Sequence, residues 1–444
     1  MKQVLRRTAV ACALALAAGA AVADNSEAIF SQALNYTVQI RTAVATPLEG
    51  DLKGTQRGAG FVIDAQRGWV LTNAHVVSRS PSRVEVAFQG QAYHEAEKIY
   101  VDPHLDLAVV RVALPAGQGA QAAALECGDL QRVGHPVGAF GHPWNLRFTG
   151  TRGIVSGVTT RMSGELLQTD APINQGNSGG PLISLDTGRI VGINTAQLRG
   201  SQNTNFAVAM RYACRVVELL RAGRDPSPPA LPIVYFNDHD DERVLKVARN
   251  YGGPGAIDLR PGDIIRGVVG VADSIQNETQ LHHALRGRLD SFSLRVERAG
   301  AEVVVTGSTA AQASTLDVRG VVAGGVFFAP TPLRDAAEVR VGALMVHYVE
   351  RGSDGDAKEL RRGDFVEAVN GEPVASLEQL RERLAAAGGA VTLTLKRYGG
   401  GDRVFTYVER RLRVETVEWV GRHPAAEGAS GLAQGDGLVP AALN

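Results

Sequence analysis

Three short segments of this 444-residue chain carry residue types that suit nucleophilic catalysis. Within Gly176–Gly180, Ser178 lies between small residues, a setting that predicts a tight turn with an exposed hydroxyl and free backbone N–H groups. Upstream, His75 follows one apolar stretch and Asp106 opens another. Histidine, aspartate and serine occur in this chain order in one class of serine hydrolase triad, so the three segments together indicate acyl-transfer chemistry.

Each proposed partner answers a chemical need. A serine hydroxyl is a poor nucleophile until a base takes its proton, and histidine suits that role because its pKa lies near neutrality. Asp106 stands among apolar residues, where a carboxylate is costly unless it accepts hydrogen bonds. A bond from the imidazole N–H of His75 would satisfy it and fix the tautomer of the ring. The alternatives are a structural histidine and an aspartate that caps a turn.

The elements that must position these residues are mainly strands. Short apolar stretches alternate with glycine-containing turns through residues 24–222, which predicts an all-β barrel or sandwich. Helical spacing in Arg211–Leu220 predicts a helix that closes this domain. The expected strands lie at residues 60–63, 69–71, 84–88, 107–112, 153–155 and 190–193.

A linker and an internal repeat follow. Residues 223–230 contain three prolines, which predicts a stiff connection. Beyond it, Leu259–Gly270 recurs 101 residues later as Leu360–Gly371, and each copy precedes a helical and then a β-patterned stretch. The repeat predicts two small mixed modules, which we name the first module (residues 231–312) and the second module (residues 313–415). Residues 416–444 are expected to form a disordered tail.

The N-terminus has the pattern of a cleavable signal peptide, residues 1–23. It combines basic residues, a short apolar run and the small-residue site Ala21-Val22-Ala23, so we expect export to the periplasm and no membrane span in the mature chain. The 46 basic residues balance 46 acidic ones, which does not favour binding to nucleic acid or to a membrane surface. Cys127 and Cys214 remain in the mature chain, either as a disulfide or as two buried thiols.

Three segments resemble the HtrA (Deg-type) serine proteases: Leu71–Val77, Asp106–Val112 and Thr169–Leu182. The likeness extends over roughly residues 57 to 412. It implies a mainly β protein, in which a chymotrypsin-like double β-barrel protease domain precedes two small α+β PDZ domains.

Carried over position by position, the resemblance also implies roles. Ser178 would be the nucleophile, His75 the general base and acid, and Asp106 the group that orients the imidazole. The backbone N–H groups of Gly176 and Ser178 would form the oxyanion hole. No metal or other cofactor is implied, and we interpret Asp238–Asp241 as a solvated acidic turn.

Two features depart from the family pattern. Asn145 stands where the family usually has a glycine after its Gly-x-Pro-Phe motif, which predicts a different loop shape there. The segment Thr46–Gln56 is short, which argues against a long regulatory loop before Arg57.

Substrate preference is partly predictable. Six residues before the serine, where trypsin has an acid, this chain has Pro172, so specificity for basic side chains is not expected. By resemblance, small aliphatic side chains would enter a pocket lined by Ile173, Asn194, Thr195 and Ala196.

The two modules resemble PDZ domains, which bind extended peptides at a sheet edge and hold the terminal carboxylate with backbone N–H groups. In the second module the expected carboxylate loop is Gly324, Gly325, Val326 and Phe327. The matching stretch of the first module is Leu231–Val234, where Pro232 lacks a donor. We therefore expect the second module to bind C-terminal peptides better; the alternative is that both modules are spacers.

Two functions are compatible with these features. One is an ATP-independent serine endopeptidase that acts on unfolded or damaged proteins of the cell envelope. Here the resemblance implies a homotrimer or larger homo-oligomer and some chaperone-like holding activity. The other is a largely inactive protease fold that binds peptides as a holdase.

Overall fold

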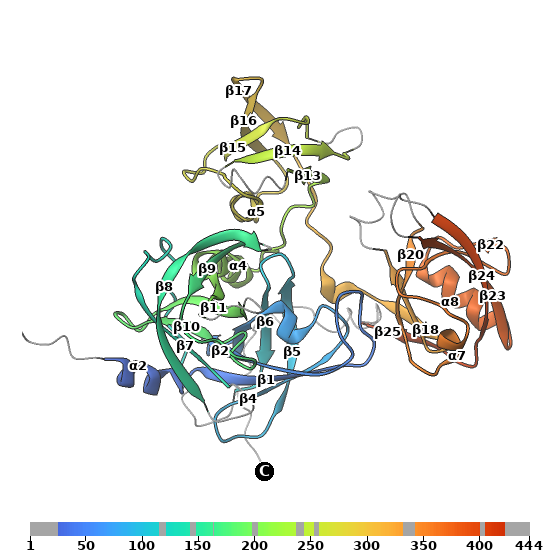
Figure 1. Ribbon diagram of the computed structural model, residues 1–444, viewed down its shortest axis with the longest axis horizontal. Coiled ribbons are helices and arrows are strands. Elements are labelled where there is room, and N and C mark those ends of the chain that lie inside the picture. Colours follow the sequence, from blue (N-terminus) through green and yellow to red (C-terminus); the bar gives the residue numbers. More distant parts are fainter. Residues whose placement is uncertain are drawn as a thin grey trace, which may run out of the picture.

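The structure, a computed structural model, describes residues 25–114, 121–142, 148–162, 164–197, 203–236, 244–252, 257–331, 342–399 and 405–421. The expected signal peptide, Asn145 and the acidic turn at 238–241 lie outside these residues. Two closed β-barrels, a first module above them and a second module to one side make up the molecule (Figure 1).

The first barrel closes in the order β1-β2-β3-β6-β5-β4. Its strands are β1 (Thr37–Val44), β2 (Gly54–Asp64), β3 (Trp69–Thr72), β4 (Arg83–Ala87), β5 (His94–Asp102) and β6 (Leu107–Val112). β3 is buried along its whole length and runs straight into the short helix α3 (Ala74–Val77). The expected strands in this half are confirmed.

The second barrel repeats the plan in the order β10-β11-β12-β9-β8-β7. Its strands are β7 (Pro136–Gly141), β8 (Thr149–Met162), β9 (Gly164–Thr169), β10 (Pro181–Ser184), β11 (Ile190–Gln197) and β12 (Asn205–Ala209). One apolar core extends through both barrels and includes the N-terminal helix α2 (Ser26–Ala33) and the closing helix α4 (Met210–Arg221). The mainly β double barrel predicted from the sequence is therefore correct.

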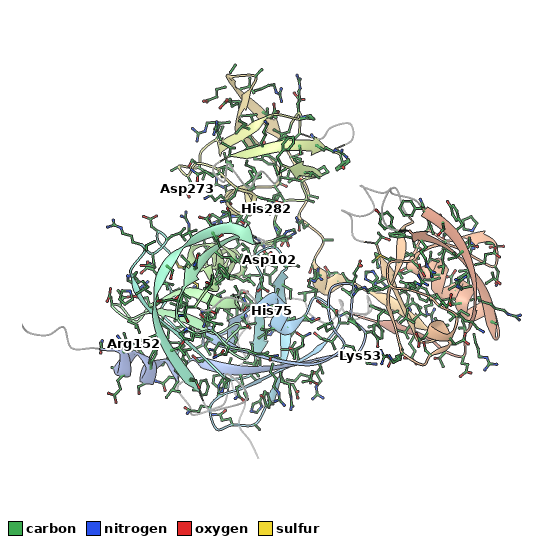
Figure 2. The ribbon with its side chains drawn as sticks, in the orientation of Figure 1. Lys53, His75, Asp102, Arg152, Asp273 and His282 are labelled. Atoms are coloured by element: carbon green, nitrogen blue, oxygen red, sulfur yellow. A yellow bond between two sulfur atoms is a disulfide. The ribbon has the colours of Figure 1, made fainter. Side chains whose placement is uncertain are left out.

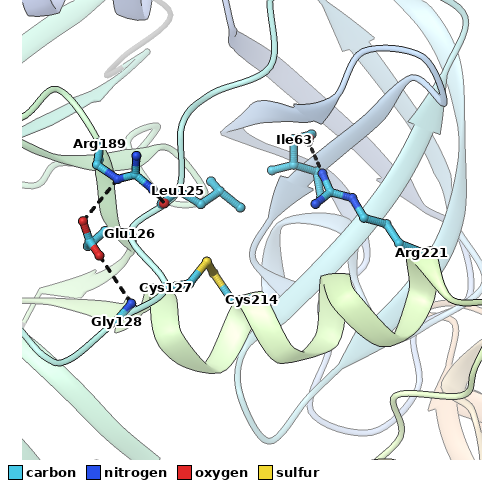
Figure 3. The surroundings of a disulfide bond; sticks show 8 residues. All are labelled: Ile63, Leu125, Glu126, Cys127, Gly128, Arg189, Cys214 and Arg221. Carbon is cyan, nitrogen blue, oxygen red and sulfur yellow. Dashed lines mark hydrogen bonds and ion pairs between the residues drawn. A yellow bond between two sulfur atoms is a disulfide. The ribbon is translucent and has the colours of Figure 1, made fainter.

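A disulfide ties α4 to the segment between the two barrels. Cys127 and Cys214 lie 5.7 Å apart at their Cα atoms and are bonded (Figure 3). Beside Cys127, Arg189 pairs with Glu126 at 3.2 Å and donates to the carbonyl of Leu125. The structure thus decides the question that the sequence left open in favour of the disulfide.

The first module is a five-stranded sheet in the order β13-β14-β15-β16-β17, together with the helix α5. Its elements are β13 (Ile233–Tyr235), β14 (Leu245–Asn250), β15 (Ile264–Val268), α5 (Glu278–Leu285), β16 (Phe292–Arg298) and β17 (Ala301–Gly307). Asn277 begins α5 by accepting a hydrogen bond from the N–H of Gln280 at 2.9 Å. The predicted helix and the β-patterned stretch after it are both present.

The second module has a larger sheet, in the order β24-β23-β21-β20-β19-β18-β25, with β22 pairing to β21. Its elements are β18 (Gly320–Ala323), β19 (Val326–Pro330), β20 (Leu344–Val349), α7 (Asp354–Ala357), β21 (Phe365–Val369), β22 (Glu372–Pro373), α8 (Leu377–Ala386), β23 (Ala390–Tyr398), β24 (Phe405–Arg413) and β25 (Val417–Val420). A short 3-10 helix, η2 (Thr315–Asp317), precedes it.

The expectation of a disordered tail from residue 416 is wrong for Val417–Val420. These residues form β25 and pair with β18 in register, from Gly320 opposite Val420 to Ala323 opposite Val417. Trp419 of β25 packs against the apolar core of the module, with the guanidinium of Arg319 5.2 Å from its ring centre. An apolar strand with a core to join explains why this stretch is ordered.

Both modules contact the double barrel (Figure 1). At the end of α5, Arg286 is fully buried and forms an ion pair with buried Asp102 of β5; it also donates to the backbone carbonyl of Pro226 in the linker. Residues 226–229 of the linker are buried as well. Figure 2 shows Asp102 and His282 at this junction, and Lys53 at the separate junction with the second module.

Within the described ranges, no helix has the length and apolar composition needed to cross a bilayer.

Candidate active site

His75 is placed by a change from strand to helix. β3 ends at Thr72, whose hydroxyl donates to the carbonyl of Ala59 at 2.7 Å, and α3 begins two residues later. The ring of His75 is 49 % exposed, while its helix neighbours Val76 and Val77 are buried. The imidazole therefore stands at the surface of a rigid support, near the middle of the double barrel (Figure 2).

Asp106 meets His75 in two ways. Its carboxylate accepts a hydrogen bond from Nδ1 of His75, at 2.8 Å to Oδ2 and 3.0 Å to Oδ1. Oδ1 also accepts from the backbone N–H of His75 at 3.0 Å. With Nδ1 carrying the proton, Nε2 is left as the basic nitrogen of the neutral ring. This is the arrangement that the sequence predicted for an imidazole oriented by a carboxylate.

Two further side chains hold Asp106. Its backbone has φ of 50°, a conformation that costs energy in a non-glycine residue unless neighbours fix it. The side-chain amide of buried Asn73 donates to the Asp106 carbonyl at 2.8 Å, and the hydroxyl of Thr195 donates to Oδ2. We expected Thr195 in a substrate pocket, and no local pattern indicates its contact with Asp106. Asn73 stands two residues before His75, so the sequence shows that it lies near the imidazole. It does not show that the Asn73 amide binds the Asp106 carbonyl.

The carboxylate changes the acidity of the ring. Partial burial of the imidazole opposes its protonation, but the hydrogen bond and charge of Asp106 outweigh that effect and raise the pKa of His75 above its ordinary value. A raised pKa makes the ring a better proton acceptor when a neighbouring hydroxyl is deprotonated.

Ser178 lies on a turn that only small residues permit. Gly179 has φ of 84°, and a Cβ there would come within 2.2 Å of both the Ala59 carbonyl and the Thr72 hydroxyl. The Ser178 carbonyl accepts from the N–H of Ala59 at 2.8 Å. The turn of the second barrel is thus pressed against β2 and β3 of the first, which brings Ser178 to the same side as His75.

The Ser178 hydroxyl points to a backbone carbonyl. It donates to the carbonyl oxygen of Thr195 at 3.0 Å, and the described residues contain no hydrogen bond between it and the His75 ring. Thr195 therefore touches both halves of the site, through its carbonyl to Ser178 and its hydroxyl to Asp106.

The expected oxyanion donors lie on the same turn. Gly176 has φ of 106°, and its carbonyl accepts from the N–H of His142 at 3.2 Å. Among the residues that the structure describes, the N–H groups of Gly176 and Ser178 have no acceptor. Two unpaired donors on one turn suit a developing negative charge.

The residues expected to line a substrate pocket differ in their roles. Ile173 is buried at 3 % exposure. Asn194 is fully buried and its amide donates to the Pro181 carbonyl at 3.0 Å, so its side chain serves the barrel. The backbone of Ala196 pairs with Phe206 in β11 and β12, and its side chain lies outside the described atoms. Asp170, which lies two residues before Pro172 and was not expected in the pocket, accepts from the N–H of Ile154 of β8 at 2.6 Å.

The structure contradicts the carboxylate loop expected in the second module. Gly324 and Gly325 have φ of 56° and 77° and form the two-residue turn of a hairpin between β18 and β19, in which Ala323 pairs with Val326. The Gly324 and Gly325 carbonyls accept from the N–H groups of Gly355 and Glu350. Val326 and Phe327 are buried strand residues. A paired hairpin has no row of free N–H groups for a carboxylate, which is why this expectation fails.

Comparison with known proteins agrees with the architecture. Residues 58–193 match the family described as a trypsin-like peptidase domain, and residues 345–397 match the PDZ domain. The periplasmic pH-dependent serine endoprotease DegQ of Escherichia coli is 28 % identical over 384 residues, covering 81 % of each chain. The periplasmic serine endoprotease DegP of Salmonella typhimurium is 26 % identical, covering 77 % of this chain and 74 % of that protein.

Solved structures give the same result. The HtrA-type protease AlgW with a decapeptide superposes with a TM-score of 0.50 at 25 % identity, over 64 % of this chain and 98 % of that one. The double barrel, the PDZ match and these relatives together support an HtrA/Deg-type serine protease.

Proposed function

We propose that this serine protease is an endopeptidase in which Ser178, His75 and Asp106 perform acyl transfer. The observation that carries the proposal is the Asp106 carboxylate on Nδ1 of His75, joined through Thr195 to the Ser178 hydroxyl. His75 Nε2 takes the hydroxyl proton while Oγ of Ser178 bonds to the scissile carbonyl carbon. The N–H groups of Gly176 and Ser178 hold the oxygen that becomes negative.

The second half of the cycle reverses these proton movements. The imidazolium gives its proton to the leaving amine as the C–N bond breaks, which leaves an ester on Ser178. Water then gives a proton to Nε2 and bonds to the ester carbonyl carbon. The imidazolium returns this proton to Oγ of Ser178 as the C–Oγ bond breaks, and the acid product leaves. Asp106 stabilises the imidazolium in both halves without taking its proton.

The serine must turn before this cycle starts. Its hydroxyl is bonded to the Thr195 carbonyl, so rotation about the Cα–Cβ bond of Ser178 has to exchange that acceptor for Nε2 of His75. Catalytic hydrogen bonds often form only in the substrate complex, so the resting orientation is compatible with activity.

The substrates we propose are unfolded or damaged polypeptides of the cell envelope. Relatives named as periplasmic endoproteases support the location, as does the N-terminal pattern expected for export. The resemblance also supports assembly as a homotrimer or larger homo-oligomer with some holding activity, which we retain as part of the proposal.

For peptide capture, we assign the receiving edge to the first module, which reverses the preference expected from sequence. Among the described residues, β13 is an edge strand that pairs with β14 alone, and its residues Ile233, Val234 and Tyr235 are half-buried. The N–H of Tyr251 bonds to the Pro232 carbonyl, so the next residue, Ile233, directs its own N–H and carbonyl away from β14. An extended peptide can add there as a further strand.

An active-site probe tests the central proposal. A fluorophosphonate should label the wild-type chain and not Ser178→Ala, and the variant should lose on the order of 10⁴-fold in cleavage of an unfolded protein. An unlabelled wild type that still binds unfolded chains would favour the alternative, an inactive holdase. Circular dichroism and thermal unfolding of Ser178→Ala establish that the variant is folded.

A further inference from the structure

The helix that carries His75 depends on its surroundings. α3 contains four residues, Ala74–Val77, and so short a helix has little stability of its own. It ends at Ser78, which has φ of 64°. A non-glycine residue keeps such a conformation only where neighbouring groups fix it. The exit of α3 is therefore a point at which the position of the imidazole is set.

The group that fixes this exit is the carboxylate of Asp51, from the loop between β1 and β2. Oδ2 of Asp51 accepts from the Ser78 hydroxyl at 2.5 Å, from the Arg79 N–H at 3.0 Å, and from the N–H and hydroxyl of Ser80 at 3.0 and 2.6 Å. These donors belong to three successive residues directly after α3. One carboxylate thus holds the whole turn.

The bonds favour the charged form of Asp51. Burial opposes ionisation, but the Ser78 and Ser80 hydroxyls and the Ser80 N–H outweigh it and hold the pKa of Asp51 below its ordinary range. Nε of Arg79 lies 3.6 Å from Oδ1 of Asp51, and its positive charge also favours the ionised carboxylate. From the other side of the turn, Lys98 donates to the carbonyls of Ser78 and Ser80 at 3.2 and 2.8 Å.

The outer side of the same loop is held by the second module. The N–H of Glu49 donates to Nδ1 of buried His347 at 3.0 Å, and His347 Nε2 donates to the Pro330 carbonyl at 3.1 Å. Lys53 pairs with Glu350 (Figure 2 labels Lys53 at this junction), and its ammonium lies 5.6 Å from the Tyr348 ring centre. These contacts come from β20 and the residue after it.

We propose that Asp51 is a positioning residue for His75, and that the second module acts on catalysis by holding the loop that carries Asp51. The proposal rests on the role of His75 as the catalytic base. It gives the second module a task other than peptide capture, since the edge of β19 is paired with β18 and β18 with β25. The short loop of residues 45–53 thus transmits the position of the second module to the imidazole.

The first experiment compares Asp51→Asn with Asp64→Asn. Asp64 is a matched control, because its carboxylate also accepts from a backbone N–H of a turn in the first barrel, that of Arg67 at 3.0 Å. In Asp51→Asn we expect kcat for a peptide substrate to fall on the order of 10–100-fold with KM changed less than about threefold. The apparent pKa of the acid limb of kcat/KM should also shift. Asp64→Asn should keep both near wild type.

Thermal unfolding places the two variants on one scale. If Asp51→Asn loses no more activity than Asp64→Asn at equal loss of Tm, or if its pH profile is unchanged, Asp51 is a structural residue and the proposal fails. Fluorophosphonate labelling of the wild type separates this from failure of the proposed function: an unlabelled wild type refutes the catalytic role of Ser178, whereas a labelled wild type with a fully active Asp51→Asn refutes only the positioning role.

A second experiment tests the part assigned to the second module. His347→Phe keeps an aromatic ring but cannot accept the Glu49 N–H, and we expect kcat to fall roughly twofold to tenfold in the full chain, with the same shift of the acid limb as in Asp51→Asn. Glu372→Gln, which removes an exposed ion pair with Arg383 inside the same module, is the control. Equal activity of His347→Phe and Glu372→Gln would overturn the role of the second module.

Discussion

The first and second modules share the arrangement of their interiors but differ at one strand edge and in their contacts with the protease domain. In each, a buried aspartate accepts two hydrogen bonds from an arginine: Asp263 from Arg298 at 2.9 and 2.7 Å, and Asp364 from Arg397 at 2.6 and 2.7 Å. The pairing of β13 with β14 matches that of β19 with β20, including a register shift at the same point. The repeated sequence motif therefore fixes the interior of the module.

The modules differ at the strand edge. The edge of β13 is unpaired among the described residues, whereas the same edge of β19 is covered by β18 and then β25. Gly324 and Gly325 allow the chain to turn back tightly between β18 and β19, because both central residues of this turn have positive φ. The matching residues of the first module are Leu231 and Pro232, and neither is a glycine. The small difference in turn residues decides whether the edge is open.

They differ again in how they contact the protease domain. The first module is joined through the fully buried pair Arg286–Asp102, whereas the Lys53–Glu350 pair of the second module is 44 % exposed at both side chains. A buried pair is costly to break, and an exposed one contributes little. The two repeats thus keep their cores and diverge at their edges and contact surfaces.

The largest expected effect comes from breaking the buried pair. Arg286→Ala should cost about 3–5 kcal/mol in the free energy of unfolding, because it leaves the Asp102 carboxylate buried without its partner. Lys53→Ala should cost less than about 1 kcal/mol. Urea unfolding followed by tryptophan fluorescence measures both.

A double variant sharpens this contrast. Arg286→Met with Asp102→Leu removes both charges, so most of the lost stability should return. If Arg286→Ala and Lys53→Ala cost the same, the difference drawn between the two contacts is wrong.

A smaller effect should appear on acidification. His282 of α5 is 6 % exposed, and burial, aided by the charges of His104 and Arg286, lowers its pKa to about 3, while Asp102 acts in the opposite direction. His282 therefore stays neutral where an unfolded imidazole takes up a proton, below about pH 6.5. The stability that neutral His282 contributes is present above that pH and is lost as the pH falls. The loss in the free energy of unfolding is about 2 kcal/mol at pH 5.

Unfolding of the wild type and of His282→Asn at pH 7 and pH 5 measures this loss. Other groups near the helix also titrate, including His283, whose pKa is lowered to about 4 by burial and by Arg211. The variant should nonetheless show a smaller pH dependence than the wild type. Identical slopes for the two proteins would contradict the assignment to His282.

The smallest effect concerns the open edge. Ile233→Pro removes one outward N–H of β13 without breaking its pairing to β14, and should weaken binding of an extended peptide about tenfold, or about 1.4 kcal/mol. Ile233→Ala keeps the N–H and separates the loss of the donor from the loss of the side chain. Fluorescence anisotropy with a labelled unfolded peptide provides the measurement. Unchanged binding to the proline variant would remove β13 as the receiving edge.

Much of this structure was predictable from local pattern. The helix at Arg211–Leu220 and the strands around His75 and Asp106 follow from periodicity, because each buries an apolar face that its own sequence displays. The proximity of His75 to Asp106 followed from chemistry, since a carboxylate among apolar residues needs a donor.

What sequence could not supply depends on contacts between distant segments. Thr195 reaches Asp106 across 89 residues, and Arg286 reaches Asp102 across 184, and neither partner carries a local signal of the other. The strand at Val417–Val420 was missed because four residues beside a Gly- and Ala-rich tail show too short a pattern. Gly324 and Gly325 were assigned to a carboxylate loop and instead form a hairpin turn, because both structures use glycine and the sequence does not distinguish them.

The Cys127–Cys214 bond closes a covalent ring around most of the barrel that carries Ser178, since 87 residues separate the two cysteines. In the chain-entropy picture, a ring of this size removes enough freedom from the unfolded chain to add about 4–5 kcal/mol of stability. Cytosolic thiols stay reduced, so a newly made chain would lack this restraint until it meets an oxidising environment. The barrel that carries Ser178 is thus expected to reach its full stability last, and only in an oxidising compartment.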